Sequence, residues 1–146
     1  MSKMIPFETT VLVRDTCLCL HTQRAARILA RRFDEAFRPV SLTNGQFSLL
    51  MSLNRPAPAP QGAVARLLGM DRTTLTAALK PLARRGLVAI GVDPSDRRGH
   101  LLALTAEGQA LLAEALPIWR ETHAAIEAGL GAFDGDSLRS ALGTLG

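Results

Sequence analysis

The chain of 146 residues contains no tyrosine and only two cysteines, and just two of its 17 basic residues are lysines. Two cysteines are too few for the disulfide framework of a small secreted domain. Its three histidines are scattered and match no metal-binding motif. The sequence also shows no nucleophile–base set and no glycine loop that would cradle a phosphate. We therefore expect that the protein is not an enzyme and binds neither a metal ion nor a cofactor.

Long apolar runs are missing as well. A membrane helix needs roughly 20 consecutive apolar residues, and no stretch approaches that length. The first residues carry one lysine and no sustained apolar segment, so they do not resemble a secretory signal. These absences predict a cytoplasmic protein with no membrane partner. Apolar residues still make up 47% of the chain, enough for the core of one domain with helical extensions.

The positive charge is concentrated in two stretches. The formal net charge is +4 with a pI near 10.0. Seven basic residues lie between Arg66 and Arg98 against three aspartates, and five arginines lie between Arg24 and Arg38. The planar fork of arginine suits phosphates and guanine edges, so nucleic acid is an allowed partner. Charge of this size does not prove such a partner, because most single charges are only solvated surface.

The N-terminal part predicts an arm followed by a long helix. Residues 1–10 lack a pattern, whereas residues 11–37 contain neither Gly nor Pro. Apolar residues recur there at threes and fours, at Leu18, Ala25, Leu29, Phe33 and Ala36. Such a helix is about 40 Å long, more than a small domain can cover, so part of its apolar stripe is expected to meet a second subunit.

The middle of the chain predicts a helix-turn-helix followed by a hairpin. A capping box of Thr43 and Gln46 starts one helix, and residues 55–60 form a proline-rich spacer. Residues 61–68 form the next helix, which Gly69 ends, and Asp71 caps a helix that runs to residue 85. Strands at 87–91 and 100–104 flank a turn at 93–99. Pro81 and Pro117 should bend or interrupt their helices.

Three segments carry a family resemblance: LTNGQFSLLMSL at 42–53, LLGMDRTTLTAALKPLARRGLV at 67–88 and DPSDRRGHLLALTAEG at 93–108. Together they resemble the MarR family of bacterial transcriptional regulators over roughly residues 16–126. The last segment is the sharpest match, because its Asp-x-Arg hairpin tip is followed by Leu-Thr-x-x-Gly. The resemblance implies a mainly α fold with a small β-hairpin wing. It also implies a homodimer on a palindromic operator, often a repressor released by a small aromatic anion or by cysteine oxidation.

We divide the chain accordingly. Residues 1–40 are expected to be an arm and dimerisation helix, residues 41–104 a winged helix-turn-helix lobe that binds double-stranded DNA, and residues 105–146 C-terminal dimerisation helices. The helix after Asp71 should enter the major groove, and by resemblance Arg98 at the hairpin tip should reach the minor groove with its guanidinium held by Asp96. The candidate DNA contacts are Arg72, Thr73, Thr74, Thr76, Lys80, Asp96, Arg97 and Arg98.

Sensing residues are harder to assign from the sequence. In a continuous helix Cys17 and Cys19 point about 200° apart, so they could not pair with each other, whereas Cys17 and His21 share a face. A cationic His21 would favour the reactive thiolate of Cys17, but burial of both cysteines as small apolar residues is the simpler interpretation. For a ligand cleft the candidates are His21, Arg24, Phe47 and Met51, the last two being equally suited to an ordinary core. Trp119 and His123 are as well suited to a dimer contact.

The sequence therefore predicts a DNA-binding transcriptional regulator, with a homodimeric repressor as the leading form. The alternative is a protein–protein interaction module that keeps the winged-helix fold without binding DNA. Basic residues on both the helix that Asp71 caps and the hairpin favour the regulator.

Overall fold

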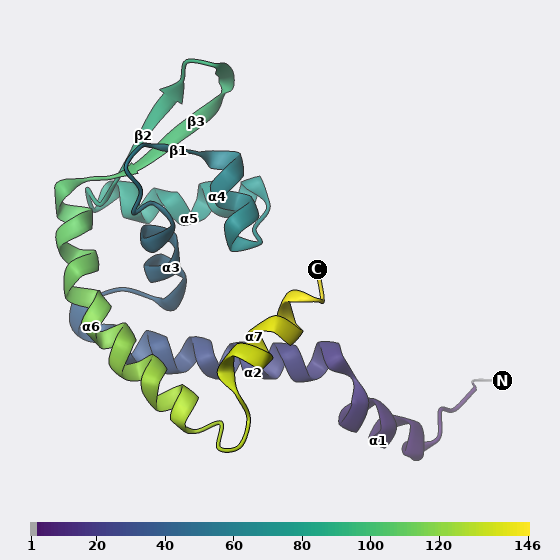
Figure 1. The fold of residues 1–146 in the computed structure, drawn as a ribbon. Helices are drawn as coiled ribbons and strands as arrows, with labels where there is room; N and C mark the ends of the chain where they lie inside the picture. The colour runs from purple at the N-terminus through teal and green to yellow at the C-terminus, as the bar shows by residue number, and fades with distance from the viewer. Residues whose placement is uncertain (1–2) are drawn as a thin grey trace.

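The computed structural model describes residues 3–146, which form helices and one small antiparallel sheet (Figure 1). The predicted fold class, mainly α with a β-hairpin wing, is confirmed. In chain order the elements are α1 (Phe7–Thr16), α2 (Leu18–Ala36), the 3₁₀ turn η1 (Arg38–Val40), α3 (Asn44–Ser52), β1 (Ala59–Pro60), α4 (Gln61–Leu68), α5 (Arg72–Arg84), β2 (Val88–Asp93), β3 (Asp96–Leu104), α6 (Ala106–Ala128) and α7 (Gly135–Gly143). Each of the helices described is too short or too polar to cross a bilayer.

The sheet lies above α3, α4 and α5, and α6 descends along one side to meet α2 below (Figure 1). Its strand order is β1-β3-β2, with both pairs antiparallel. The spacer at 55–60 is more than a spacer, because its last two residues form β1 and pair with Leu102 and Leu101. Pro60 has no backbone N–H to give to a ladder, which an edge strand tolerates.

The core lies where α3, α5 and β3 meet the end of α2. Phe37, Leu50, Leu75, Leu82 and Leu102 are fully buried there. Burial of one such side chain stabilises the fold by about 1.5–3 kcal/mol. The apolar face of α5 is thus inside and its polar face outside, as the sequence pattern predicts.

The predicted caps are present. Thr43 and Gln46 form the capping box of α3, and Asp71 accepts the Thr74 backbone N–H at the start of α5. Thr105 caps α6 through the Gly108 N–H. Gly69 has φ 67°, the left-handed conformation that ends α4 and begins the turn.

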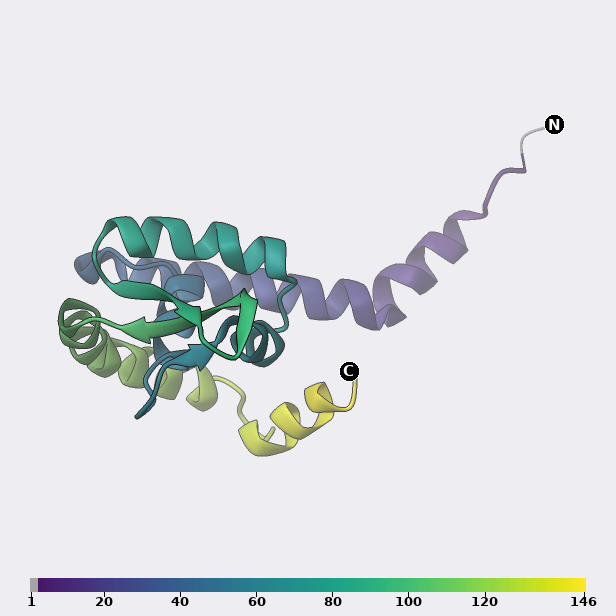
Figure 2. The same cartoon turned by 90° about the horizontal axis from the view of Figure 1, so that it is seen from above.

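The N-terminal prediction is wrong in two respects. A helix already begins at Phe7 in the predicted arm, of which residues 1 and 2 lie outside the described residues. The predicted helix over 11–37 is two helices, because Cys17 has an extended backbone (φ −69°, ψ 111°) and acts as the N-cap of α2. Helix α1 contains no buried residue, and Figure 2 shows it projecting away from the rest of the chain.

Both internal prolines lie within unbroken helices, Pro81 in α5 and Pro117 in α6. Neither proline interrupts its helix, which was one of the two outcomes expected from the sequence. A proline leaves the carbonyl four residues earlier without its helical donor. Those carbonyls belong to Ala77 and Ala113, two exposed residues, where water can take the place of the missing N–H.

Candidate nucleic-acid interface and effector pocket

The start of α5 presents polar side chains beside a tight turn. Gly69 and Met70 turn the chain, with the Met70 N–H bonded to the Ala65 carbonyl at 2.9 Å. The Thr74 backbone N–H holds the pKa of the Asp71 carboxyl below its ordinary value, so the cap is ionised near neutral pH. On the outer face of α5, the predicted DNA-contacting residues Arg72, Thr73, Thr74, Thr76 and Lys80 are all exposed.

Two guanidinium groups gather next to this helix start. A Cβ placed on Gly62, at the start of α4, would lie 3.8 Å from Arg66 Nη1 and 3.8 Å from Arg72 Nη2. No ion pair in residues 3–146 involves either arginine. This end of the helix pair therefore combines free positive side chains with the positive end of the α5 dipole, an arrangement that attracts anions.

The hydroxyl of Thr76 is already used within the protein. It donates to the Arg72 carbonyl at 2.8 Å and accepts the Gln61 side-chain N–H at 2.9 Å. These bonds tie α4 to α5 and leave the Thr76 methyl group as its main feature for an outside partner. Gln61 was not among the sequence candidates, because a single glutamine at a helix start carries no distinguishing signal.

The C-terminal end of α5 is anchored to the loop between η1 and α3. Arg85 Nη1 donates to the Ser41 carbonyl at 2.8 Å, where Ser41 itself has a left-handed backbone with φ 53°. Arg85 therefore positions the helix. Lys80, near the middle of the helix, is exposed and forms no ion pair within residues 3–146.

The hairpin is longer than predicted. Only Pro94 and Ser95 connect β2 to β3, so Arg97 and Arg98 lie on a strand next to the tip. The Ser95 hydroxyl and backbone N–H lower the pKa of the Asp93 carboxyl and fix the turn. The ladder pairs Val92 with His100 and Asp93 with Asp96, with an irregularity between the two pairs, so Arg97 and Arg98 have no partner residue on β2. Both arginines therefore lie in a bulge of β3 beside the turn.

Asp96 supports Arg98 in a different way from that predicted. Its carboxylate accepts the backbone N–H of Arg98 at 3.0 Å, and no ion pair joins it to the guanidinium. The side chains of Arg97 and Arg98 are both exposed at this tip. Asp96 thus shapes the strand from which Arg98 projects, and the guanidinium is left unpaired among the described residues.

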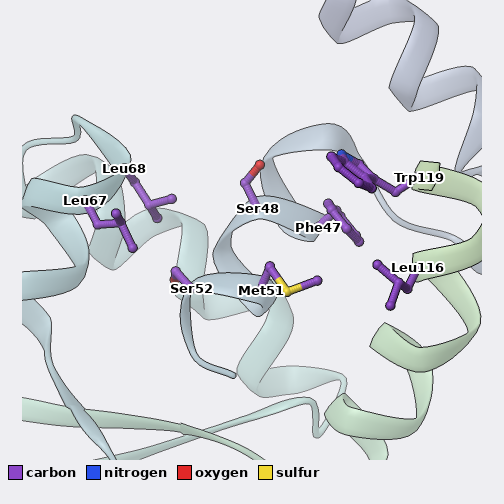
Figure 3. A pocket seen from close by; sticks show the side chains of 8 residues that line it. All are labelled: Phe47, Ser48, Met51, Ser52, Leu67, Leu68, Leu116 and Trp119. Carbon is purple, nitrogen blue, oxygen red and sulfur yellow. The ribbon is translucent and has the colours of Figure 1, made fainter. Parts of the chain in front are cut away.

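A largely apolar pocket lies between α3, α4 and α6 (Figure 3). Its volume is about 480 Å³, within the range of small-molecule sites. Phe47 and Met51 line it, as the sequence prediction allowed, but His21 and Arg24 do not. The other lining residues are Ser48, Ser52, Leu67, Leu68, Leu116 and Trp119.

His21 and Arg24 lie on α2, where both are exposed. The His21 ring is bonded through Nδ1 to the carbonyl of Cys17 at 2.8 Å, so it serves the start of that helix. Trp119 belongs to the pocket, although a dimer contact was equally expected from the sequence. Contacts between α3, α4 and α6 depend on distant segments, so no local pattern could have assigned these residues.

Stacked rings connect the pocket to the core. Phe33, Phe37, Phe47, Trp119 and His123 follow one another with ring centroids 5.8, 4.7, 6.4 and 4.6 Å apart. These rings come from α2, its C-terminal cap, α3 and α6. The aromatic wall of the pocket is therefore continuous with the packing that holds the three helices together.

The two cysteines lie at the junction of α1 and α2. Both thiols are free; Cys17 is half-buried and Cys19 exposed. The Cys17 sulfur accepts the Leu20 N–H at 3.4 Å, and the Cys19 sulfur accepts the Gln23 side-chain N–H at 3.3 Å. Because Cys17 is not helical, the argument that a continuous helix keeps the two thiols apart does not hold. Nowhere in residues 3–146 do three or more metal-ligating side chains cluster.

Comparison with known proteins agrees with this architecture. The MarR family model matches residues 42–100. The curated HTH-type transcriptional repressor NicR of Pseudomonas putida is 34% identical over 80 residues, which are 55% of this chain and 51% of NicR, so the chain spans about half the length of that relative.

Two solved structures match over most of both chains. The M. tuberculosis regulator MosR in complex with DNA is 37% identical with a TM-score of 0.81, covering 89% of this chain and 93% of MosR. The repressor CouR of Rhodococcus jostii, bound to a 23-mer DNA duplex, is 33% identical with a TM-score of 0.70, covering 99% of this chain and 96% of CouR. With this similarity in both sequence and fold, the chain belongs to the MarR family of transcriptional regulators, which are not enzymes.

Proposed function

We propose that this chain is a homodimeric, sequence-specific DNA-binding regulator that represses transcription from a palindromic operator. The observation that carries the proposal is that Arg72 on α5 and Arg98 at the hairpin tip are both exposed and form no ion pair within residues 3–146. The apolar faces of α5 and of the hairpin pack into the same core. Helix α5 is sized for the major groove, and a hairpin beside it reaches the neighbouring groove. The DNA complexes of MosR and CouR support the same use of the fold here. Its place of action is then the cytoplasm, where a bacterial chromosome lies.

Each candidate contact has a role that follows from its position. Arg72 at the start of α5 can pair bidentately with guanine, and Thr73 and Thr74 follow it on the exposed face. Thr76 offers its methyl group to a thymine methyl, since its hydroxyl is bonded internally. Arg98 is suited to the minor groove, where negative potential is concentrated.

The phosphate contacts are assigned to Lys80 and Arg97, both exposed on the elements that carry the base-reading residues. Contacts of this kind position a protein on the duplex without reading sequence. They also make affinity fall as salt rises, with a log–log slope near −0.9 for each phosphate neutralised.

The dimer is proposed from apolar surface that one chain cannot cover. On α1 and the start of α2, Phe7, Leu12 and Leu18 are 74%, 59% and 70% exposed, and Phe133 near the C-terminus is 80% exposed. Surface of this kind marks a protein interface. Residues 1–40 and 105–146 would then form the dimer, with each 41–104 lobe free to meet one operator half-site.

We assign the dissociation of the regulator from its operator to the binding of a small molecule in the pocket between α3, α4 and α6. CouR has been solved with p-coumaroyl-CoA at 32% identity to this chain, which supports a ligand-responsive role for the fold. The cavity volume of about 480 Å³ and its apolar lining suit such a ligand.

An oxidant acting at the cysteines is the second candidate for release. The exposed thiol of Cys19, next to the non-helical Cys17, favours it. A peroxide would lose one oxygen atom to the sulfur as its O–O bond breaks, giving a sulfenic acid and an alcohol or water. Thiol titration with and without peroxide, followed by DNA binding, tests this; unchanged binding after full oxidation removes the candidate.

The DNA-binding proposal is tested by selecting bound fragments from random DNA and measuring affinity by fluorescence anisotropy at several salt concentrations. Arg98→Ala should lose about 1–3 kcal/mol of operator binding, roughly 5- to 150-fold, with the dimer still folded. Arg120→Ala, which removes an exposed arginine from α6, is the charge-matched control and should bind like the parent. If no sequence were selected, the interaction-module alternative would remain. Equal affinity of the two variants would contradict the role assigned to Arg98.

A further inference from the structure

Arg66, on α4, is not among the predicted DNA contacts, yet its guanidinium lies near that of Arg72. Arg66 Nη1 and Arg72 Nη2 are each 3.8 Å from the point that a Cβ on Gly62 would occupy, so the two nitrogens are no more than twice that distance apart. Both side chains are exposed, and neither forms an ion pair within residues 3–146. Two like charges this close repel each other unless an anion lies between them.

The local structure brings the two side chains together. Arg66 follows Gly62 by one helical turn, and side chains on a helix lean toward its N-terminus, so the Arg66 guanidinium reaches the first turn of α4. Arg72 is the first residue of α5. The Gln61 side-chain N–H donates to the Thr76 hydroxyl at 2.9 Å, which holds the starts of the two helices against each other. The turn and this bond together set the spacing of the two arginines.

The carboxylate next to Arg72 in the chain is already used as a helix cap. Asp71 accepts the Thr74 backbone N–H at 2.7 Å and takes part in no ion pair within residues 3–146. Helix α4 has no side-chain cap of its own, because Pro60 occupies its N-cap position. Two oxygens of one phosphate, each about 2.7–2.9 Å from its donor nitrogen, can bridge the gap between the two guanidinium groups.

The position of this arginine pair fits the DNA backbone beside the groove that α5 would enter. In a helix-turn-helix, the first helix crosses the sugar–phosphate backbone while the second contacts base edges. Helix α4 is the first helix here, and both arginines belong to the 41–104 lobe, which the proposed dimer leaves free. Arginine has five N–H donors, so Arg72 can contact a guanine edge with two of them and still donate to a phosphate.

We propose that Arg66 and Arg72 jointly hold one phosphate group of the operator backbone, and that Arg66 thereby positions α5 in the groove. The inference rests on the proposed DNA-binding function and adds to it a residue outside α5 and the hairpin. Because the two arginines share one phosphate, removal of either weakens the contribution of the other. Because every step of the duplex carries the same phosphate, Arg66 strengthens binding to any sequence, whereas Arg72 also contributes to the choice of sequence.

Fluorescence anisotropy with the selected operator and with a scrambled duplex of equal length measures the role of Arg66. Arg66→Ala should weaken binding of both duplexes by the same factor, at least about tenfold at low salt, and should make the log–log salt slope shallower by about 1 for each subunit. Arg66→Lys keeps the charge and should keep the parent slope. Arg120→Ala, the control for loss of one exposed arginine, should bind like the parent.

Two results would contradict the role of Arg66. One is a parent-like affinity and salt slope in Arg66→Ala, with a parent-like circular dichroism melt. The other is a loss confined to the selected operator, since that pattern indicates base reading.

A double-mutant cycle tests whether the two arginines share one phosphate. The loss in the Arg66→Ala, Arg72→Ala double variant should be smaller than the product of the single losses, by about threefold or more, and a loss equal to that product contradicts sharing. Operator duplexes that each carry one neutral methylphosphonate locate the phosphate. At one position in each half-site the parent should lose affinity while Arg66→Ala does not, and absence of such a position overturns the proposal.

Inorganic phosphate, exchanged for chloride at constant ionic strength, distinguishes the operator backbone from a free anion. The exchange should affect DNA binding by the parent and by Arg66→Ala equally, and a larger effect on the parent would assign the two arginines to free phosphate instead. A parent that selects no DNA would defeat the proposed function. A parent that binds its operator through Arg98, with Arg66→Ala indistinguishable from Arg120→Ala, would defeat only the role of Arg66.

Discussion

Gly108, in the first turn of α6, gives the sharpest stability prediction. A Cβ placed there would lie 2.1 Å from the Leu87 carbonyl oxygen and 3.3 Å from Leu104 Cδ2. Real contacts of this type are not closer than about 3 Å, so Gly108→Ala must move the helix and the base of the hairpin apart by about 1 Å. The glycine of the Leu-Thr-x-x-Gly pattern is therefore required by a close backbone approach.

The cost can be worked from the bonds at this junction. The Thr105 N–H donates to the Leu87 carbonyl at 3.1 Å, and the Thr105 hydroxyl donates to the Gly86 carbonyl at 2.6 Å. A shift of about 1 Å breaks the first bond and strains the second, which costs about 1–2 kcal/mol. Overpacking adds about 1–3 kcal/mol, and the better helix propensity of alanine returns about 1 kcal/mol. Together these ranges give a net loss of about 1–4 kcal/mol.

Urea denaturation followed by circular dichroism measures this loss at one fixed protein concentration, because a dimer's apparent stability depends on concentration. Gly45→Ala is the control: Gly45 also lies in the first turn of a helix, but a Cβ there meets nothing within 4 Å. That variant should be unchanged or up to about 1 kcal/mol more stable. If Gly108→Ala matched it, the close approach of α6 to the hairpin would be wrong.

Three further outcomes are expected. Leu12→Glu, a change on the exposed apolar face of α1, should yield monomers in sedimentation velocity, and a persistent dimer would contradict the assigned interface. The backbone and side-chain N–H groups of Asn44 hold the pKa of Asp34 below its ordinary value of 3.8. Its stabilising effect is therefore present above pH 3.8 and disappears as the pH falls through the lowered pKa, and Asp34→Ala should flatten the acid limb of the stability–pH curve. Thr76→Val keeps the methyl group but loses the bond to Gln61, so stability should fall by about 1 kcal/mol while operator preference persists; altered preference in fragment selection would assign base reading to the hydroxyl.

Where the fold follows from local rules, the sequence predicts it closely. The caps at Thr43, Asp71 and Thr105, the turn at Gly69 and the buried edge of α5 all depend on residues within a few positions of one another. Such interactions leave a readable pattern because capping and helical periodicity have fixed spacings.

Predictions failed where a distant segment decides the outcome. Pro60 forms an edge strand only because β3 lies beside it. The sequence left the place of Trp119 open, and the packing of α6 on α3 puts it at the pocket. The break between α1 and α2 at Cys17 contains no glycine or proline, so the sequence contained no signal from which it could have been predicted. His21 and Arg24 were assigned to a ligand cleft by resemblance alone, and neither lines the pocket between α3, α4 and α6, so their role in sensing stays a prediction.

The position of the pocket explains how a ligand there would reach the DNA-binding surface. Leu67 and Leu68 form the α4 side of the pocket, and Leu116 and Trp119 form the α6 side (Figure 3). Helix α4 is tied to α5 by the Gln61–Thr76 bond, so we expect a molecule that separates α4 from α6 to displace the start of α5, where Arg72 lies. Because such coupling is reciprocal, a ligand that weakens operator binding must itself be bound more weakly, by the same factor, when the operator is present. Weaker binding of a ligand in the presence of operator DNA, by the factor by which that ligand weakens operator binding, would therefore be the signature of this route.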